Sequence, residues 1–127
     1  KAVNDNYGHQ TGDMVLQKIS SNIIKACRSH DTVSRYGGEE FGIILPETGI
    51  EKSTRVAERM LDAVSSNSYL PVAQNITISI GIASFPDHAM DRTELIQKAD
   101  LALYASKGNG KNRFTIYDGS LEAGDRH

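Results

Sequence analysis

The sequence SRYGGEEFGIIL, which occupies residues 34–45, places two glycines directly before two glutamates and an apolar run. The segments on either side of Gly37 and Gly38 have the composition of short β-strands. A two-residue Gly-Gly connection predicts a β-hairpin, because both central positions of a type I′ turn need a positive φ. Turn geometry does not require adjacent acids, so Glu39 and Glu40 need a second explanation.

Periodicity on both sides of the hairpin predicts an α+β fold, with helices packed on a largely antiparallel sheet. Apolar residues at helical spacing indicate three helices, and alternating isoleucines indicate a strand after the second of them. The expected helices cover 11–28, 50–66 and a segment beginning at Asp91 or Thr93, and the expected strands cover 32–36, 39–45, 76–83 and 114–117. We expect one domain over residues 1–118 and a flexible tail over residues 119–127.

Composition narrows the class of protein and of ligand. The 127 residues carry a formal net charge of -2, which argues against a duplex nucleic-acid binder but leaves room for a small anionic ligand. No apolar run approaches the roughly 18 residues of a membrane span. The single cysteine, Cys27, cannot form an internal disulfide and lies on the apolar side of a helical pattern. It therefore fits buried packing and a reducing, cytoplasmic compartment.

The hairpin glycines and glutamates have two interpretations. Turn geometry alone is the simpler reason for an isolated Gly-Gly pair, while missing Cβ atoms would also let a ligand approach the backbone closely. The acids favour the second interpretation, because successive strand residues point to opposite faces and one carboxylate would lie near a packed face. A divalent cation would offset that cost, and Mg²⁺ prefers carboxylates completed by water and substrate phosphates.

A second polar cluster, KAVNDNYGHQTGD, occupies the first thirteen residues, before and at the start of a helix. Capping of the loop is the simpler explanation for most of its members. Asn4 and Asp13 differ, because an amide and a carboxylate together can hydrogen-bond the edge of a guanine base. For His9, capping or packing is about as plausible as contact with a ligand.

A third cluster, SKGNGKNR, closes the last predicted helix. Cations at a helix C-terminus are ordinary partners of the helix dipole, so Lys107 and Lys111 alone indicate little. The glycines between them permit a turn that aims both ammonium groups at one anion, for which phosphate is the natural candidate.

Four segments in this order resemble the GGDEF family of diguanylate cyclases. They are KAVNDNYGHQTGD, RYGGEEF (a GGEEF variant of the family signature), ITISIGIA and ADLALYASKGNGKNR. Members of that family join two GTP molecules into cyclic di-GMP and release two pyrophosphates. The resemblance implies a ferredoxin-like fold similar to the palm of nucleotide polymerases and class III nucleotidyl cyclases.

The resemblance also implies roles for individual residues. Glu39 matches a ligand of Mg²⁺ (or Mn²⁺) that is also the general base. Glu40 matches the second signature acid, with a supporting or metal-binding role. The implied substrate contacts are Asn4, His9 and Asp13 for the base, Gly37 and Gly38 for close approach, and Lys1, Lys107 and Lys111 for the phosphates. Lys1 is the implied stabiliser of the transition state. Lys111 stands where many members carry arginine, so the charge is kept but the bidentate fork is lost.

The sequence RSHD places Arg28 and Asp31 shortly before the GGEEF signature. The simpler explanation is an ion pair at a helix end, which contributes little to stability when exposed. By resemblance, the pair matches the inhibitory site at which the family binds its product, cyclic di-GMP. We favour the product site, because both residue types and their interval agree with it.

The resemblance also implies protein partners and a low activity of the chain by itself. Each domain would hold one GTP, so catalysis would need a homodimer brought together by an upstream regulatory domain, with or without a membrane tether in the parent protein. In the family, a strand before the lysine matched by Lys1 supplies a metal-binding aspartate. Because the sequence begins after that strand, we expect the chain by itself to turn over poorly.

Two other classes of function compete with the enzyme. A catalytically silent GGDEF-like module would bind cyclic di-GMP or GTP as a sensor. A structural dimerisation domain would explain none of the three polar clusters, so it ranks last. The complete signature favours the cyclase over the sensor.

Overall fold

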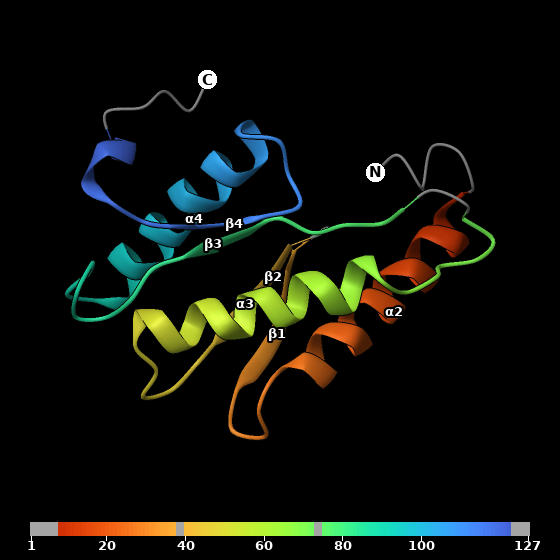
Figure 1. Cartoon of the computed structure of the whole chain (residues 1–127), viewed down its shortest axis with the longest axis horizontal. Coiled ribbons are helices and arrows are strands. Elements are labelled where there is room, and N and C mark those ends of the chain that lie inside the picture. The colour runs from red at the N-terminus through yellow and green to blue at the C-terminus, as the bar shows by residue number, and fades with distance from the viewer. Residues whose placement is uncertain (1–7, 38–39, 73–74, 123–127) are drawn as a thin grey trace.

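The computed structural model describes residues 8–37, 40–72 and 75–122 (Figure 1). The elements in chain order are α2 (His9–Ala26), β1 (Thr32–Gly37), β2 (Glu40–Ile44), α3 (Ile50–Ser65), β3 (Ile80–Ile82), α4 (Arg92–Gly108), β4 (Phe114–Ile116) and the 3-10 helix η1 (Gly119–Glu122). The predicted α+β class is confirmed, as is the order of the elements.

The hairpin forms, but its connection lies one residue later than the sequence predicts. β1 and β2 pair antiparallel from Thr32 opposite Ile44 to Gly37 opposite Glu40, with an irregularity in register between Arg35 and Gly37. Gly37 is therefore the last residue of a strand, and the connection consists of residues 38 and 39, which lie outside the described residues. The expected Gly37-Gly38 turn is wrong by one position, because the irregularity uses one extra residue of β1.

The second half of the chain builds a different kind of pair. β3 and β4 are parallel, with Ile80, Gly81 and Ile82 opposite Phe114, Thr115 and Ile116. The described strands thus form two separate two-stranded sheets, one antiparallel and one parallel. Parallel neighbours need a long crossover, and α4 supplies it.

The expected strand over 76–83 is shorter in the structure. Only Ile80–Ile82 is a strand, because β4 offers just three residues for pairing. Ile76 and Ile78 still pack against the hydrophobic core as half-buried side chains. The alternating pattern therefore predicted the buried face correctly but overestimated the length of the ladder.

Helices α2 and α3 enclose the main core. They pack against each other, while α4 lies against β3 and β4 in the other half of the molecule (Figure 1). The core residues are apolar side chains at helical spacing from both helices and from the loop after α3: Val15, Ile19, Ile23, Val56, Ala57, Met60, Val64, Tyr69 and Val72. Half-buried hairpin residues such as Phe41 and Ile43 pack on this core and so anchor the hairpin to α2 and α3.

The contact between α4 and β3 depends on a glycine. A Cβ built on Gly81 would lie 2.2 Å from the backbone oxygen of Ala99 and 2.2 Å from the backbone nitrogen of Leu103. Across the same contact, the Ser106 hydroxyl donates to the carbonyl oxygen of Ile80 at 2.8 Å. Any side chain at Gly81 would push the helix off the sheet, because backbone atoms cannot rotate away.

The start of α4 agrees with the sequence signal, whereas α2 lies two residues earlier than the expected 11–28. Asp91 caps α4, since its carboxylate accepts a hydrogen bond from the backbone of Glu94 at 2.8 Å. The segment expected as a flexible tail begins with η1, and residues 123–127 lie outside the described residues. Across the described ranges, no helix combines the length and apolar character needed to cross a membrane.

Candidate functional site

Of the two signature acids, the structure describes only Glu40, at the start of β2. Glu40 is the first residue of β2 and its side chain is exposed, whereas Gly38 and Glu39 fall outside the described residues. Within the described ranges, no three His, Cys, Asp or Glu side chains form a group that could hold a metal ion. The oxygen chemistry of Glu39 and Glu40 suits a hard cation such as Mg²⁺, with water and substrate completing its ligands.

The first turns of α2 carry the next predicted residues. His9 is the first residue of the helix and Asp13 lies one turn later, and both are exposed. Gly8 precedes them at a φ of 89° and accepts a hydrogen bond from the backbone of Gly12 at 3.1 Å. Lys1 and Asn4 are outside the described residues, so their predicted roles remain predictions.

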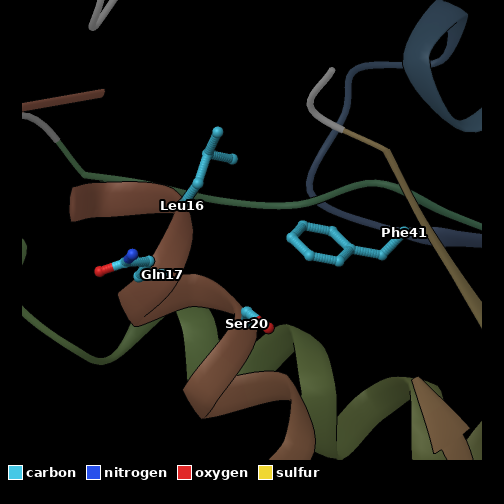
Figure 2. A pocket seen from close by; sticks show the side chains of 4 residues that line it. All are labelled: Leu16, Gln17, Ser20 and Phe41. Carbon is cyan, nitrogen blue, oxygen red and sulfur yellow. The ribbon is translucent and has the colours of Figure 1, made fainter. Parts of the chain in front are cut away.

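A hollow opens between α2 and β2 (Figure 2). Leu16, Gln17 and Ser20 line it from the helix, and Phe41 lines it from the strand. Asp13 lies on the same stripe of α2, because residues three and four positions apart share a helix face. The hollow therefore lies beside the candidate guanine-binding carboxylate, with Phe41 directly following Glu40 in the chain.

Sequence reasoning missed this hollow. Leu16 is one of the apolar residues at helical spacing that predict the helix over 11–28, and Phe41 lies in the strand predicted over 39–45; both are half-buried in the structure. The available signal was the spacing of Asp13 and Leu16, which places an acid and an apolar side chain together on one helix face. Phe41 lies opposite this helix face because of the way the hairpin packs against α2, and the spacing of residues in the sequence does not reveal that packing.

The two predicted phosphate-binding lysines lie in and just after the last turn of α4. Lys107 and Lys111 are both exposed, and neither forms an ion pair with another described residue. Lys111 has a φ of 62° and donates its backbone N–H to the carbonyl oxygen of Ser106 at 2.9 Å. The structure thus keeps both ammonium groups accessible, as an anion site requires.

Gly110 is what permits this turn after α4. It has a φ of 122°, and a Cβ there would lie 2.7 Å from Nη2 of Arg113. The Nε of Arg113 donates to the carbonyl oxygen of Lys111 at 3.1 Å and closes the loop. A residue with a side chain would be strained at this φ, so glycine is required between the lysines.

Arg28 and Asp31 are brought together by a four-residue turn after α2. The backbone N–H of Asp31 donates to the carbonyl oxygen of Arg28 at 3.0 Å, and the backbone N–H of Arg28 donates to Oδ2 of Asp31 at 2.8 Å. The guanidinium adds bonds from Nε to both carboxylate oxygens at 3.2 and 3.1 Å and from Nη2 to Oδ1 at 2.9 Å. An interval of three residues is the interval that such a turn closes.

Burial and charge distinguish the two partners. The Asp31 side chain is 0% exposed and the Arg28 side chain is 29% exposed. Hydrogen bonds from Arg28 hold the pKa of Asp31 below its usual range, and the same pairing raises the pKa of Arg28. The carboxylate is therefore charged and saturated, while part of the guanidinium still faces solvent.

A second hollow adjoins this pair. Ile24, Cys27 and Val33 form its apolar lining, beside Arg28, Ser29 and Asp31. Burial raises the pKa of the Cys27 thiol, and the nearby charge of Asp31 acts in the same direction. Cys27 is thus a neutral packing residue, in agreement with the interpretation made from its helical position.

Comparison with known proteins identifies relatives over nearly the whole chain. The family model described as "Diguanylate cyclase, GGDEF domain" matches residues 1–113. Diguanylate cyclase A of Treponema denticola is 42% identical over 124 residues, which cover 95% of this chain and 33% of that protein. Diguanylate cyclase DosC of Escherichia coli strain K12 is 42% identical over 125 residues, which cover 95% of this chain and 27% of that protein. The chain thus spans a third or less of each.

Solved structures support the same relationship. The active GGEEF domain of a diguanylate cyclase from Vibrio cholerae superposes with a TM-score of 0.85 at 31% identity, covering 92% of this chain and 75% of that one. The GGDEF domain of DgcB from Caulobacter crescentus, solved in complex with c-di-GMP, gives a TM-score of 0.82 at 35% identity, covering 91% and 70%.

Proposed function

The chain belongs to the GGDEF domain family, and from this premise we propose that its protein condenses two GTP molecules into cyclic di-GMP and releases two pyrophosphates. The observation that carries the proposal is the hollow between α2 and β2. Leu16, Gln17 and Ser20 line it from the face of α2 that also carries Asp13, and Phe41, which follows Glu40 in the chain, lines it from β2 (Figure 2). Groups from α2 and from the β1–β2 hairpin could thus contact the base and the triphosphate of one bound GTP.

Base recognition would fall to α2 and the residues before it. The carboxylate of Asp13 would accept hydrogen bonds from the ring N–H and the exocyclic amine of guanine, and the amide of Asn4 would contact the same edge. Leu16 and Phe41 would supply apolar contact to the purine ring, because both line the adjoining hollow. His9, exposed at the start of α2, would contact the substrate at the mouth of the hollow.

Phosphate binding would use the accessible lysines. The ammonium groups of Lys107 and Lys111 have no carboxylate partner among the described residues, so they could bind a triphosphate. Lys1 would stabilise the charge that develops in the transition state. Gly37 and Gly38 lack Cβ atoms, which would let the nucleotide lie close to the hairpin backbone.

Glu39 and Glu40 would hold a magnesium ion, which when bound supplies positive charge to the phosphates and the attacking oxygen. Glu39 would also accept the proton of the ribose 3′-hydroxyl as that oxygen attacks the α-phosphorus of the other GTP. A bond to the leaving pyrophosphate breaks as the new phosphodiester forms. The lysines would offset the charge left on the pyrophosphate.

Ring closure requires two nucleotides to face each other. Each domain offers one guanine-binding stripe, so two copies of the domain would have to meet as a homodimer. An upstream regulatory domain in the parent protein would control that dimerisation. The cytoplasm supplies GTP and keeps Cys27 reduced, so we place the reaction there.

The Arg28–Asp31 turn would bind the product. Arg28 keeps a solvent-facing edge beside an apolar hollow, an arrangement that suits a guanine ring with an attached phosphate. Product binding there would inhibit the enzyme. The structure of the Caulobacter crescentus relative in complex with c-di-GMP supports this proposal.

The test is turnover by the full-length protein with GTP and Mg²⁺, measured as cyclic di-GMP by chromatography. We expect formation that Glu39→Ala reduces at least about 100-fold, and inhibition by added product that Arg28→Ala weakens. No product from any full-length preparation, together with tight Arg28-dependent binding of cyclic di-GMP, would instead identify a catalytically silent sensor. Product formation that survives Glu39→Ala unchanged would overturn the proposed chemistry.

A further inference from the structure

We infer that Thr48, which lies twenty residues beyond Arg28, positions the Arg28 guanidinium for cyclic di-GMP, an inference that rests on the proposed product site. Nη2 of Arg28 donates to the Thr48 hydroxyl oxygen at 2.5 Å. The Thr48 hydroxyl in turn donates to the carbonyl oxygen of Pro46 at 2.8 Å. The polarity of this chain is fixed, because a guanidinium only donates and a carbonyl only accepts.

Thr48 ties the product site to a separate part of the fold. It is half-buried in the connection between β2 and α3, immediately before the residue that precedes α3. Pro46 and the left-handed Glu47, at a φ of 51°, shape that connection. The guanidinium is therefore held from two sides, by Asp31 in its own turn and by Thr48 in a turn distant in sequence.

The hydrogen bonds to Asp31 and Thr48 leave part of the Arg28 guanidinium available to a ligand. A guanidinium has five N–H groups, one on Nε and two on each Nη. Nε is directed at Asp31, and Nη2 is shared between Asp31 and Thr48. Nη1 has no acceptor among the described residues, so its two N–H groups form the edge offered to the product. Removing the Thr48 hydroxyl would free one Nη2 hydrogen and let the plane of the guanidinium turn.

Positioning of this kind acts on affinity by limiting the orientations that the arginine must give up on binding. Hydrogen bonds to charged groups are also stronger than neutral ones, so the loss of the Thr48 contact should be measurable. We expect Thr48→Val to weaken binding of cyclic di-GMP by about fivefold to tenfold. Thr48→Ser keeps the hydroxyl and should bind within about twofold of the wild type.

The matched control is Thr54 in the first turns of α3. Its hydroxyl donates to the carbonyl oxygen of Glu51 at 2.7 Å, as Thr48 does to Pro46, but it forms no hydrogen bond with Arg28. Thr54→Val therefore removes a threonine-to-backbone hydrogen bond from the same region without touching the guanidinium. Its affinity for cyclic di-GMP and its cyclase rate should equal those of the wild type.

The experiment is calorimetric titration of the full-length protein with cyclic di-GMP, for the three threonine variants, Arg28→Ala and Arg28→Ala/Thr48→Val. If Thr48 acts through Arg28, Thr48→Val weakens binding in the wild-type background and adds nothing in the Arg28→Ala background. A merely structural role would instead add the same loss in both backgrounds.

The outcomes separate this inference from the proposed function. If Arg28→Ala weakens binding and Thr48→Val leaves it unchanged, the product site stands and the role of Thr48 is refuted. Equal weakening by Thr48→Val and Thr48→Ser would also refute it, because the hydroxyl would not be the cause. If Arg28→Ala itself leaves binding unchanged, the proposed product site fails, and the role of Thr48 fails with it.

Discussion

The two candidate sites are built in opposite ways. At the Arg28–Asp31 turn, the Asp31 side chain is fully buried, and Arg28 is held by Asp31 and Thr48 before any ligand arrives. Asp13, on the face of α2 that also lines the other hollow, is exposed, and its side chain forms no hydrogen bond with another described residue. The Arg28–Asp31 turn is therefore an interlocked site, whose polar groups bind one another, and the hollow beside Asp13 is an open site, whose polar groups face solvent.

The difference separates stability from ligand recognition. Interlocked groups contribute to folding, so changing them should alter both folding and binding. Open polar groups find their partners only in the ligand, so changing them should reduce activity with little effect on folding. An open site also relies on groups from other segments or another copy, in keeping with a reaction that needs two nucleotides.

The largest effect that would test this contrast is expected at Asp13. Replacing it with Ala should lower kcat/KM for GTP by about 100-fold or more, because guanine donors would be left without an acceptor in the bound complex. The melting temperature of the full-length protein should change by no more than about a degree or two. Lys18→Ala, at an exposed position of α2 that lines neither hollow, is the control, and a loss of equal size there would contradict the assignment.

Leu16 provides a second test of the open site. Leu16→Ala should raise KM for GTP by about tenfold, because it removes apolar contact from the wall of the hollow. Steady-state kinetics with GTP over a range of concentrations would measure this effect. An unchanged KM with a strongly lowered melting temperature would show that Leu16 serves the core and not the nucleotide.

The interlocked site can be tested by the effect of pH on the stability that Asp31 contributes. Because Arg28 holds the Asp31 pKa below the ordinary value near 3.9, the native protein binds that proton less readily than the unfolded chain does. This contribution to stability is present above about pH 4 and is lost as pH falls through the lowered pKa. Asp31→Asn should therefore be less stable than wild type at pH 7, with the difference narrowing below pH 4.

Urea unfolding at pH 7, 5 and 3 would measure this narrowing. Asp87→Asn is the control, because Asp87 is exposed and forms no ion pair within the described ranges. Its difference from wild type should stay small at every pH. A gap between Asp31→Asn and wild type that stays constant down to pH 3 would contradict the pairing.

The smallest expected effect concerns Cys27. Its raised pKa keeps the thiol protonated near neutral pH, so alkylation by iodoacetamide at pH 7.5 should be about tenfold slower than for a free cysteine. Because Cys27 lines the hollow beside Arg28, bound cyclic di-GMP should slow it further. Mass spectrometry over time would follow the reaction, and alkylation as fast as that of free cysteine would contradict the burial.

Local patterns were enough for much of the fold. The helices and the hairpin were predictable because residues three, four or two positions apart decide which face is apolar. Asp91 was recognisable as a cap, and the Arg28–Asp31 interval is closed by a single turn. The hairpin connection was misplaced by one residue, because an irregularity in register leaves no simple mark in the sequence.

The helices, the hairpin, the family and the charged groups could be inferred from residue types and short spacings along the chain. Only the tertiary structure decided that β3 and β4 run parallel, that Phe41 faces Leu16, and that Thr48 reaches Arg28. These contacts join residues far apart along the chain. Their geometry depends on how whole helices and strands pack, and no local rule of spacing encodes that.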